Sequence, residues 1–490
     1  MDDTTTPNSL TFLMFPFHFD TGTDKNPSLA ASLDNDADSI WERSDDAIED
    51  NVMYDYITPN IDTNTTPYLV YSIKSAPKSA TAKRRINNIW KKIDAQFDSE
   101  EKTYGINFRK ETRNWNSARL VISPLTNIGL LSLGVGIKGG GEVSEEDAVN
   151  FGYTLRKIDG QVKLRLTGYN PDKDSEGYIE AKQSTLEDIL TEIGSKYMDT
   201  GECLLKDIVM FLLKDVSRHT ESLGLFDTGR AHIFNYFSAF RPSGELTEDD
   251  KKTIIHFTRA ENQKYQPLDN EFETSGSYMS TFKNIYMGCS AEGSSIFTIQ
   301  SEDASNSFIK NFPMSTLQHR YMWLYIMALM QRHSLLRMIT TLQQVDLDTF
   351  SSDVRSEFNN NYRYLCKIKT GGWFSNVSAL AQHNQYYNFC MRNLQITSLY
   401  DEVSDKMETL NSYLEMRGHE LQERKAEFQN RLAKVGFVIS IAAALLAFPQ
   451  TASALEELFR FGTATTSILT AVIMLVMAAI TMVVWCHKKK

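Results

Sequence analysis

The stretch Ser467–Cys486 reads SILTAVIMLVMAAITMVVWC and contains no charged residue. At about 1.5 Å per residue, a helix of this length spans a hydrocarbon core of about 30 Å. A fully buried core helix is the alternative interpretation, but uncharged runs this long are typical of membrane spans. The stretch therefore predicts a membrane-spanning helix near the C-terminal end of the chain.

A second apolar segment precedes it, Val435–Phe448 with the sequence VGFVISIAAALLAF. Its length covers only about 21 Å, which by itself favours a buried or re-entrant segment. Two features favour a span: no helix breaker lies between Glu420 and Lys434, and Ala442–Ala444 is small enough for close helix packing. Pro449 then marks the expected exit, so the two segments predict a membrane hairpin.

The flanking charges predict how this hairpin is oriented. Basic residues precede the first segment and follow the second, whereas the loop between them carries Glu456, Glu457 and a single Arg460. By the positive-inside rule, both termini are cytoplasmic and the chain is a multi-pass protein of the bacterial inner (plasma) membrane. The flanking basic residues are Arg424, Lys425, Arg431, Lys434, Lys488, Lys489 and Lys490.

The amino-acid composition limits the number of domains and the kinds of ligand that the chain can be expected to have. The 490 residues are 42% hydrophobic and 23% charged, which is ordinary for globular material and enough for two or three domains. The net charge of -11 argues against direct nucleic-acid binding, because phosphate neutralisation needs a basic face. Five scattered cysteines form no C-x-x-C pair, so we expect reduced thiols, no metal site and no resident cofactor. No signal peptide is expected, since no basic region with an apolar run opens the chain.

Residues 1–312 alternate strand-like and helix-like patterns. They predict an α/β (α+β) domain with a mixed or mostly antiparallel sheet, followed by a helical stalk at 313–434 and the transmembrane hairpin at 435–490. Gly139–Gly141 is not a phosphate loop, because no Lys-Ser or Lys-Thr follows. The expected strands include Leu10–Phe19 (interrupted at Pro16), Ala118–Ile122, Ile128–Ile137, Val162–Leu166, Ala231–Phe237, Ile254–Thr258 and Ser295–Ile299; the expected helices include Ala82–Phe97 and Met314–Leu347.

A long charged helix is expected from about Gln385 to the first apolar segment. Met407, Leu414, Leu421, Phe428 and Val435 recur every seven residues within it, which is half of a coiled-coil seam. A companion series at the same spacing ends in arginines. An oligomer packed on this seam would place rings of Arg at the mouth of a pore, and such rings favour anions. The candidate pore-lining residues are Arg417, Arg424, Phe428, Arg431 and Val435.

The alternative is that these arginines are solvated. Glu420–Arg424 and Glu427–Arg431 are favourable i,i+4 pairs on a helix surface. In that interpretation the arginines stabilise the helix and help to set the membrane orientation, and they do not line a pore.

An α/β domain, a stalk helix, two C-terminal spans and a short acidic loop together resemble the CorA-like two-transmembrane transporter superfamily. The segments Tyr325–His333 and Trp373–Ser378 resemble the corresponding regions of divergent members. The family's Gly-Met-Asn transport signature is missing, and Ala447–Thr451 (AFPQT) stands in its place. The chain is therefore most similar to the CorA membrane effectors associated with type III CRISPR systems, which lack the signature.

This resemblance implies a homo-oligomer, expected to be a pentamer, that forms a channel or pore in the lipid bilayer. It implies gating by a nucleotide second messenger, an S-adenosylmethionine–AMP conjugate, in antiviral defence. A bound divalent cation is left open.

A nucleotide ligand needs cationic donors for phosphate and an aromatic or guanidinium plane for adenine. One candidate is a basic and aromatic cluster that lies outside any clean apolar stripe, and the turn Asp227–His232 is a second, through Arg230 and His232. A solvated surface patch is the alternative for both. The first cluster comprises Arg109, Lys110, Arg113, Trp115 and Arg119.

Two other functions compete with the effector. A divergent CorA-like magnesium transporter would use a different filter, and a membrane-anchored enzyme would carry a catalytic motif. The sequence contains no nucleophile elbow, HExxH motif or P-loop, so we expect no enzyme.

Overall fold

The computed structural model divides the chain into two compact units, Met1–Met407 and Glu408–Lys490. The domain bounds expected at 312/313 and 434/435 stay predictions. The described residues are 8–20, 29–44, 53–54, 68–74, 76–83, 85–86, 94–98, 103–108, 118–137, 143–158, 163–167, 202–302, 307–343, 376–459 and the single positions 362, 363, 365, 366, 369, 374, 468, 471, 472 and 475.

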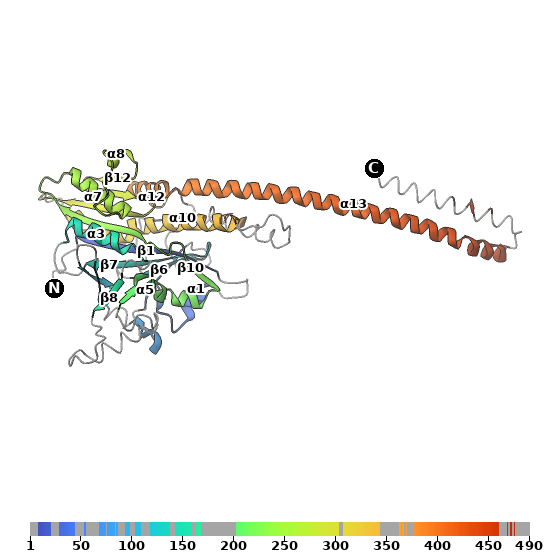
Figure 1. Cartoon of the computed structure of the whole chain (residues 1–490), viewed down its shortest axis with the longest axis horizontal. Coiled ribbons are helices and arrows are strands. Elements are labelled where there is room, and N and C mark those ends of the chain that lie inside the picture. Colours follow the sequence, from blue (N-terminus) through green and yellow to red (C-terminus); the bar gives the residue numbers. More distant parts are fainter. Residues whose placement is uncertain are drawn as a thin grey trace. The chain divides into compact units, whose positions relative to one another are not determined.

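One branched sheet organises the first unit (Figure 1). Ten of its 14 described strands follow the order β12-β13-β14-β11-β1-β7-β5-β4-β8-β9, while β10 pairs with β1 and the β2-β3-β6 ladder joins β7. Among the described pairs, only β11 and β14 run parallel, so the sheet is mixed. The strands are β1 (Ser9–Asp20), β2 (Trp41–Arg43), β3 (Leu69–Ile73), β4 (Asp94–Asp98), β5 (Thr103–Phe108), β6 (Arg119–Ser123), β7 (Ile128–Ile137), β8 (Lys163–Thr167), β9 (Glu202–Leu204), β10 (Ser222–Leu225), β11 (His232–Phe240), β12 (Tyr278–Phe282), β13 (Ile285–Cys289) and β14 (Gly293–Gln300).

Helices cover both faces of this sheet near β11. The helices of the first unit are α1 (Leu29–Asn35), α3 (Glu145–Leu155), α5 (Leu205–Leu212), α6 (Lys214–Arg218), α7 (Glu248–Arg259), α8 (Glu271–Thr274), α9 (Ser307–Phe312), the π-helix η4 (Pro313–Tyr321), α10 (Met322–Gln343) and α12 (Ala381–Asn393). Because side chains alternate along a strand, the two faces of β11 meet different helices. Phe237 and Ala239 share one core with α3 and α7. Phe234 packs on Tyr325 of α10, on the opposite face.

Helix α7 occupies a stretch for which a strand, Ile254–Thr258, was predicted, and that prediction is wrong. The hydroxyl of Thr247 accepts a hydrogen bond from the backbone N–H of Asp250, whose carboxylate in turn accepts one from the backbone N–H of Thr247. This capping box satisfies two donors that a new helix leaves open. Ile254 and Phe257, three residues apart, then enter the same core, as a helix period requires.

Helix α10 is buried almost all round, as its sequence predicts: Trp323, Leu324 and Tyr325 are each fully enclosed. Beyond α12 the chain turns at Gln395, which has a φ of 55° and lies between α12 and α13 (Ile396–Phe459). The long helix expected from Gln385 is therefore two helices.

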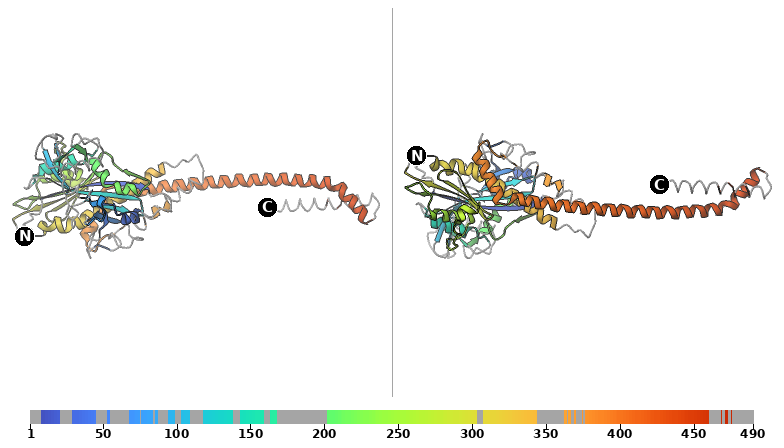
Figure 2. Two further views of the ribbon diagram at one scale, coloured as in Figure 1. Left: turned by 90° about the horizontal axis from the view of Figure 1, so that it is seen from below. Right: turned by 90° about the horizontal axis from the view of Figure 1, so that it is seen from above.

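Helix α13 is one continuous helix of 64 residues, which passes through Pro449 and Glu456 (Figure 2). Within the second unit it exposes several large apolar side chains. Phe428 is 63% exposed and Val435 is 55% exposed.

The predicted fold class included a C-terminal transmembrane hairpin, and the structure contradicts this part of the prediction. In the part of the chain that the structure describes, no helix combines the length and the apolar character needed to cross a bilayer. The segment Val435–Phe448 does not end at Pro449, because α13 continues through it into polar and acidic sequence. The second segment, Ser467–Cys486, lies largely outside the described residues. The predicted multi-pass location in the bacterial inner membrane, with cytoplasmic termini, is accordingly not supported.

Candidate functional site

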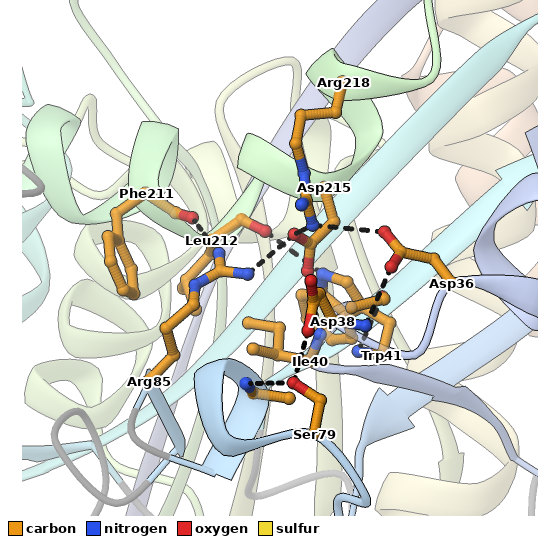
Figure 3. A network of polar contacts seen from close by, with 12 residues as sticks. Asp36, Asp38, Ile40, Trp41, Ser79, Arg85, Phe211, Leu212, Asp215 and Arg218 are labelled. Carbon is orange, nitrogen blue, oxygen red and sulfur yellow. Dashed lines mark hydrogen bonds and ion pairs between the residues drawn. The ribbon is translucent and has the colours of Figure 1, made fainter.

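Two groups of charged side chains stand out in the first unit. The first is centred on Asp215 of α6, which is fully buried (Figure 3). Its Oδ1 accepts a hydrogen bond from Arg85 Nη1 at 2.7 Å and another from Arg218, and its Oδ2 accepts one from the Ile40 backbone N–H at 2.9 Å. Both carboxylate oxygens are thus paired within the protein.

The partners of Asp215 are themselves paired. Arg85 also donates to the Phe211 carbonyl and lies over the Phe211 ring, with 5.1 Å between guanidinium carbon and ring centroid. Arg218 reaches Asp36 at 3.1 Å, and His219 Nε2 lies 2.9 Å from the same carboxylate. Because the Asp215 carboxylate is paired within the protein, the network fixes α6 to the segment before β2 and offers little to a ligand.

The second group lies where the parallel strands β11 and β14 begin, and we call it the His232 cluster. Several elements far apart in sequence supply it: the end of α3, the turn before β11, the start of β11 and the middle of α10. Its members are Tyr153, Arg156, Lys157, Arg230, His232, Arg332 and His333.

The backbone brings the end of α3 beside the turn before β11. Lys157 and Arg230 form an antiparallel bridge, the Ala231 N–H donates to the Arg156 carbonyl at 2.8 Å, and the Ile158 N–H donates to the Gly229 carbonyl at 2.9 Å. Asp227 shapes the turn by accepting the backbone N–H groups of Gly229 and Arg230. The two basic positions at 157 and 230 are therefore neighbours.

His232 is placed by the strand alternation that turns even-numbered positions of β11 towards α10. Its ring lies edge-on to His333, with 5.1 Å between centroids. A hydrogen bond to the Ala291 carbonyl involves one ring nitrogen, and the other, Nδ1, is buried with no partner among the described residues. Burial lowers the pKa of His232 to about 4, and the charges of Arg332 and Arg156 act in the same direction. The ring is therefore neutral at pH 7.

The two enclosed arginines are held by backbone carbonyls. Arg156 donates to the carbonyls of Arg259 and Ala260 at 2.6 and 3.0 Å, and Arg332 donates to the Leu394 carbonyl. Burial lowers the pKa of Arg156, and the charge of Arg230 lowers it further. The cluster thus concentrates positive charge where it is incompletely hydrated.

The outer part of the cluster combines a cation with aromatic rings. Lys157 Nζ lies 3.0 Å from the Tyr153 hydroxyl and 4.1 Å from the centroid of its ring. The hydrogen bond from Lys157 lowers the pKa of Tyr153, and a second one from Tyr265 contributes. Tyr265 is 55% exposed, so it presents an aromatic surface to solvent beside the basic groups.

Three acidic side chains act on these cations. Glu292 and Glu261 both raise the pKa of Arg156, and Asp227 raises that of His333, against the dominant lowering by burial. Burial raises the pKa of Glu261. The cluster is accordingly rich in charge of both signs, with four cations at positions 156, 157, 230 and 332.

Of the sequence-predicted ligand residues, Arg230 and His232 fall in this cluster. Arg109, Lys110, Arg113 and Trp115 lie outside the described residues. Arg119 is 4% exposed in β6, and donates to the Ala118 carbonyl at 3.4 Å. Of this predicted cluster, Arg119 alone lies within the described residues.

The candidate pore-lining residues lie on α13 in the second unit. Arg417 donates to the Tyr413 hydroxyl at 3.1 Å and to Glu420 at 3.2 Å, a surface pairing different from the Glu420–Arg424 pair of the alternative interpretation. Arg424, Phe428, Arg431 and Val435 are exposed. A pore-lining role stays a prediction.

Sequence reasoning missed Tyr153, Arg156, Lys157, Arg332 and His333. The pair Arg156-Lys157 at the end of a helical pattern is a weak local sign of an anion site. The burial of His333 beside His232 is visible only in three dimensions.

Comparison of the chain with protein-family models, curated proteins and solved structures gives no match. The resemblance to the CorA-like superfamily therefore stays a prediction.

Proposed function

We propose that this chain is a nucleotide-responsive sensor that binds a phosphate-bearing adenine nucleotide at the His232 cluster. The observation that carries the proposal is a gathering of cations beside His232, whose Nδ1 has no partner among the described residues. The charges of Arg156 and Arg332 act on the His232 ring, and the neighbouring positions 157 and 230 add two more cations, with the Tyr153 ring beside Lys157. Arginine and lysine are the residues that recognise phosphate, and aromatic faces accept a base.

The acidic side chains beside the cluster support a ligand that carries charge of both signs. An S-adenosylmethionine–AMP conjugate, the second messenger that the resemblance implies, combines a phosphate with a sulfonium cation. Glu261, Glu292 and Asp227 would face the sulfonium, while the arginines and Lys157 would hold the phosphate. A simple adenine dinucleotide tests the phosphate part of this proposal alone.

The proposed sensor acts as a homo-oligomer assembled through α13. Phe428 and Val435 are spaced by seven residues and exposed, and Leu432 between them is 54% exposed. Such a stripe on a helix is stabilised when identical helices pack together. The ring size stays open, since the seam is compatible with several oligomers.

The membrane pore and the antiviral role implied by the resemblance are not carried into this proposal, because no described helix could cross a membrane. The magnesium-transporter and enzyme alternatives stay predictions.

Thermal stabilisation of the purified full chain tests the proposal. Adenine nucleotides, including the S-adenosylmethionine–AMP conjugate, should raise the melting temperature with concentration, because a ligand that binds only the native state stabilises it. Stabilisation by magnesium or other divalent cations, and by no nucleotide, would overturn the nucleotide-sensor proposal in favour of a cation-binding protein.

Replacing both Phe428 and Val435 by glutamate should weaken self-association at least tenfold, since like charges would meet in the seam. Sedimentation velocity over a concentration series measures this. The matched control is Gln422→Glu with Gln429→Glu, which has the same spacing and added charge on exposed positions beside the seam. Equal weakening by both pairs, or by neither, would contradict assembly through the seam.

A further inference from the structure

The imidazole of His232 has an unusual hydrogen-bonding state in the free protein. A carbonyl oxygen can only accept, so the ring nitrogen at Ala291 carries the proton. Nδ1 is then a buried lone pair with no donor among the described residues. A second proton on Nδ1 would turn this site from an acceptor into a donor.

Each element packed near the ring contributes titratable or charged groups that act on His232 itself or on its neighbours Arg156, Arg332 and His333. Helix α10 contributes Arg332 and His333, and the end of α3 contributes Arg156. The connection between β13 and β14 contributes the Ala291 carbonyl and Glu292, and the turn before β11 contributes Asp227 and Arg230. His333 uses its own Nδ1–H to donate to the Leu329 carbonyl at 2.8 Å, so it does not supply a donor through that atom.

Burial and the charges of the two arginines hold His232 neutral. A bound anion would act against both effects. A phosphate beside Arg332 and Arg156 offsets their field at the ring. It also offers an acceptor to a protonated Nδ1, which favours the charged form of the imidazole. Binding and protonation therefore support each other through linkage.

We propose that His232 takes up one proton from solvent when the phosphate-bearing ligand binds, so that the site binds more tightly as the pH falls. The inference rests on the proposed function of the His232 cluster. In the balance, neutral His232, one proton and the anionic ligand give imidazolium and bound anion, and no bond other than N–H forms. The affinity of the cluster for its ligand thereby depends on pH.

The direction of the pH dependence follows from the pKa of His232 in the free and in the ligand-bound protein. In the free protein His232 stays neutral above a pKa of about 4, and the bound anion raises that pKa. Between these two values, each unit fall in pH should strengthen binding by up to tenfold. Above the bound-state value the affinity should be flat.

Isothermal titration calorimetry with the phosphodiester ApA (adenylyl-3′,5′-adenosine) tests this, because the charge of the probe is constant between about pH 5.5 and 8, where histidine titrates. Wild-type protein should bind more tightly at the lower pH, with a binding heat that depends on the buffer and reports proton uptake. The variant His232→Gln should bind more weakly and without pH dependence. The control His256→Gln, in which a buried histidine of α7 with an unpartnered Nδ1 is removed, should keep the wild-type pH dependence.

The outcomes separate the two proposals. Binding of ApA with no pH dependence and no proton uptake would overturn the role of His232 and leave the nucleotide site standing. Persistence of the pH dependence in His232→Gln would also overturn it. Absence of ApA binding at every pH would overturn the proposed function itself. If His232→Gln does not fold, NMR titration of the histidine ring protons in the wild type decides: a pKa of His232 that does not rise with ApA contradicts the inference.

Discussion

Replacing Asp215 by alanine is expected to lower the free energy of unfolding by about 3–5 kcal/mol, because it removes the buried carboxylate that pairs with Arg85. Arg85 is 3% exposed and Asp215 is fully buried, so solvent cannot replace the lost carboxylate. The backbone N–H of Ile40 loses its acceptor in the same change. Urea unfolding followed through tryptophan fluorescence measures the loss, since Trp41 donates to the Leu212 carbonyl beside this network.

Two controls distinguish the effect of breaking the buried ion pair from the effect of removing a side chain in general. The double variant Arg85→Met, Asp215→Leu removes both charges and should recover much of the stability, because apolar residues of similar size replace a buried pair at little cost. Lys252→Ala removes an exposed cation whose side chain is 56% accessible and which lies 3.4 Å from Asp249. It should change the free energy of unfolding by less than about 1 kcal/mol. A loss in Asp215→Ala no larger than that control would contradict the role given to the network.

The double variant Lys157→Ala, Arg230→Ala is expected to weaken nucleotide binding about a hundredfold or more. Each side chain would lose a charge-assisted hydrogen bond to phosphate, worth about 1.5–3 kcal/mol. Two such losses together exceed the roughly 2.7 kcal/mol that corresponds to a hundredfold. Arg230 is exposed and Lys157 half-buried, so the variant should fold.

Calorimetric titration with ApA measures the effect, and Lys251→Ala with Lys252→Ala is the matched control. These two lysines of α7 contact the surface carboxylates Glu248, Glu273 and Asp249, and their removal costs the same two charges. The control should bind within about threefold of the wild type. Unchanged binding in the Lys157, Arg230 variant would show that the cluster does not hold the phosphate.

Strands were predictable from sequence where both an apolar run and the residues at its two ends indicate a strand. Ile128–Ile137 is found with the expected bounds, and the expected interruption of the first strand at Pro16 does not occur. Pro16 pairs with Leu130 of β7 on one side. On the other side it falls between the ladder with β11, which ends at Met14, and the ladder with β10, which starts at Phe17. A proline is tolerated there because no partner needs its missing N–H.

Other elements were missed because local pattern and tertiary context disagree. The predicted helix Ala82–Phe97 overlaps β4, since Asp94–Asp98 pairs with both β5 and β8. The His232 cluster joins residues near 156, 230 and 332, and only Arg230 and His232 share a local motif. The sheet brings the rest together, and no spacing in a single sequence encodes that. The predicted hairpin was wrong at its first exit, because Pro449 was expected to end the first segment and α13 continues through it to Phe459.

Photoaffinity labelling with an azido-adenine analogue of ApA tests the central claim most directly, since it asks where the nucleotide lies. The account predicts labels, displaced by unlabelled ApA, on peptides that carry Tyr153 or Tyr265. Displaceable labels confined to other parts of the chain, such as the peptide that carries Trp115, would contradict it.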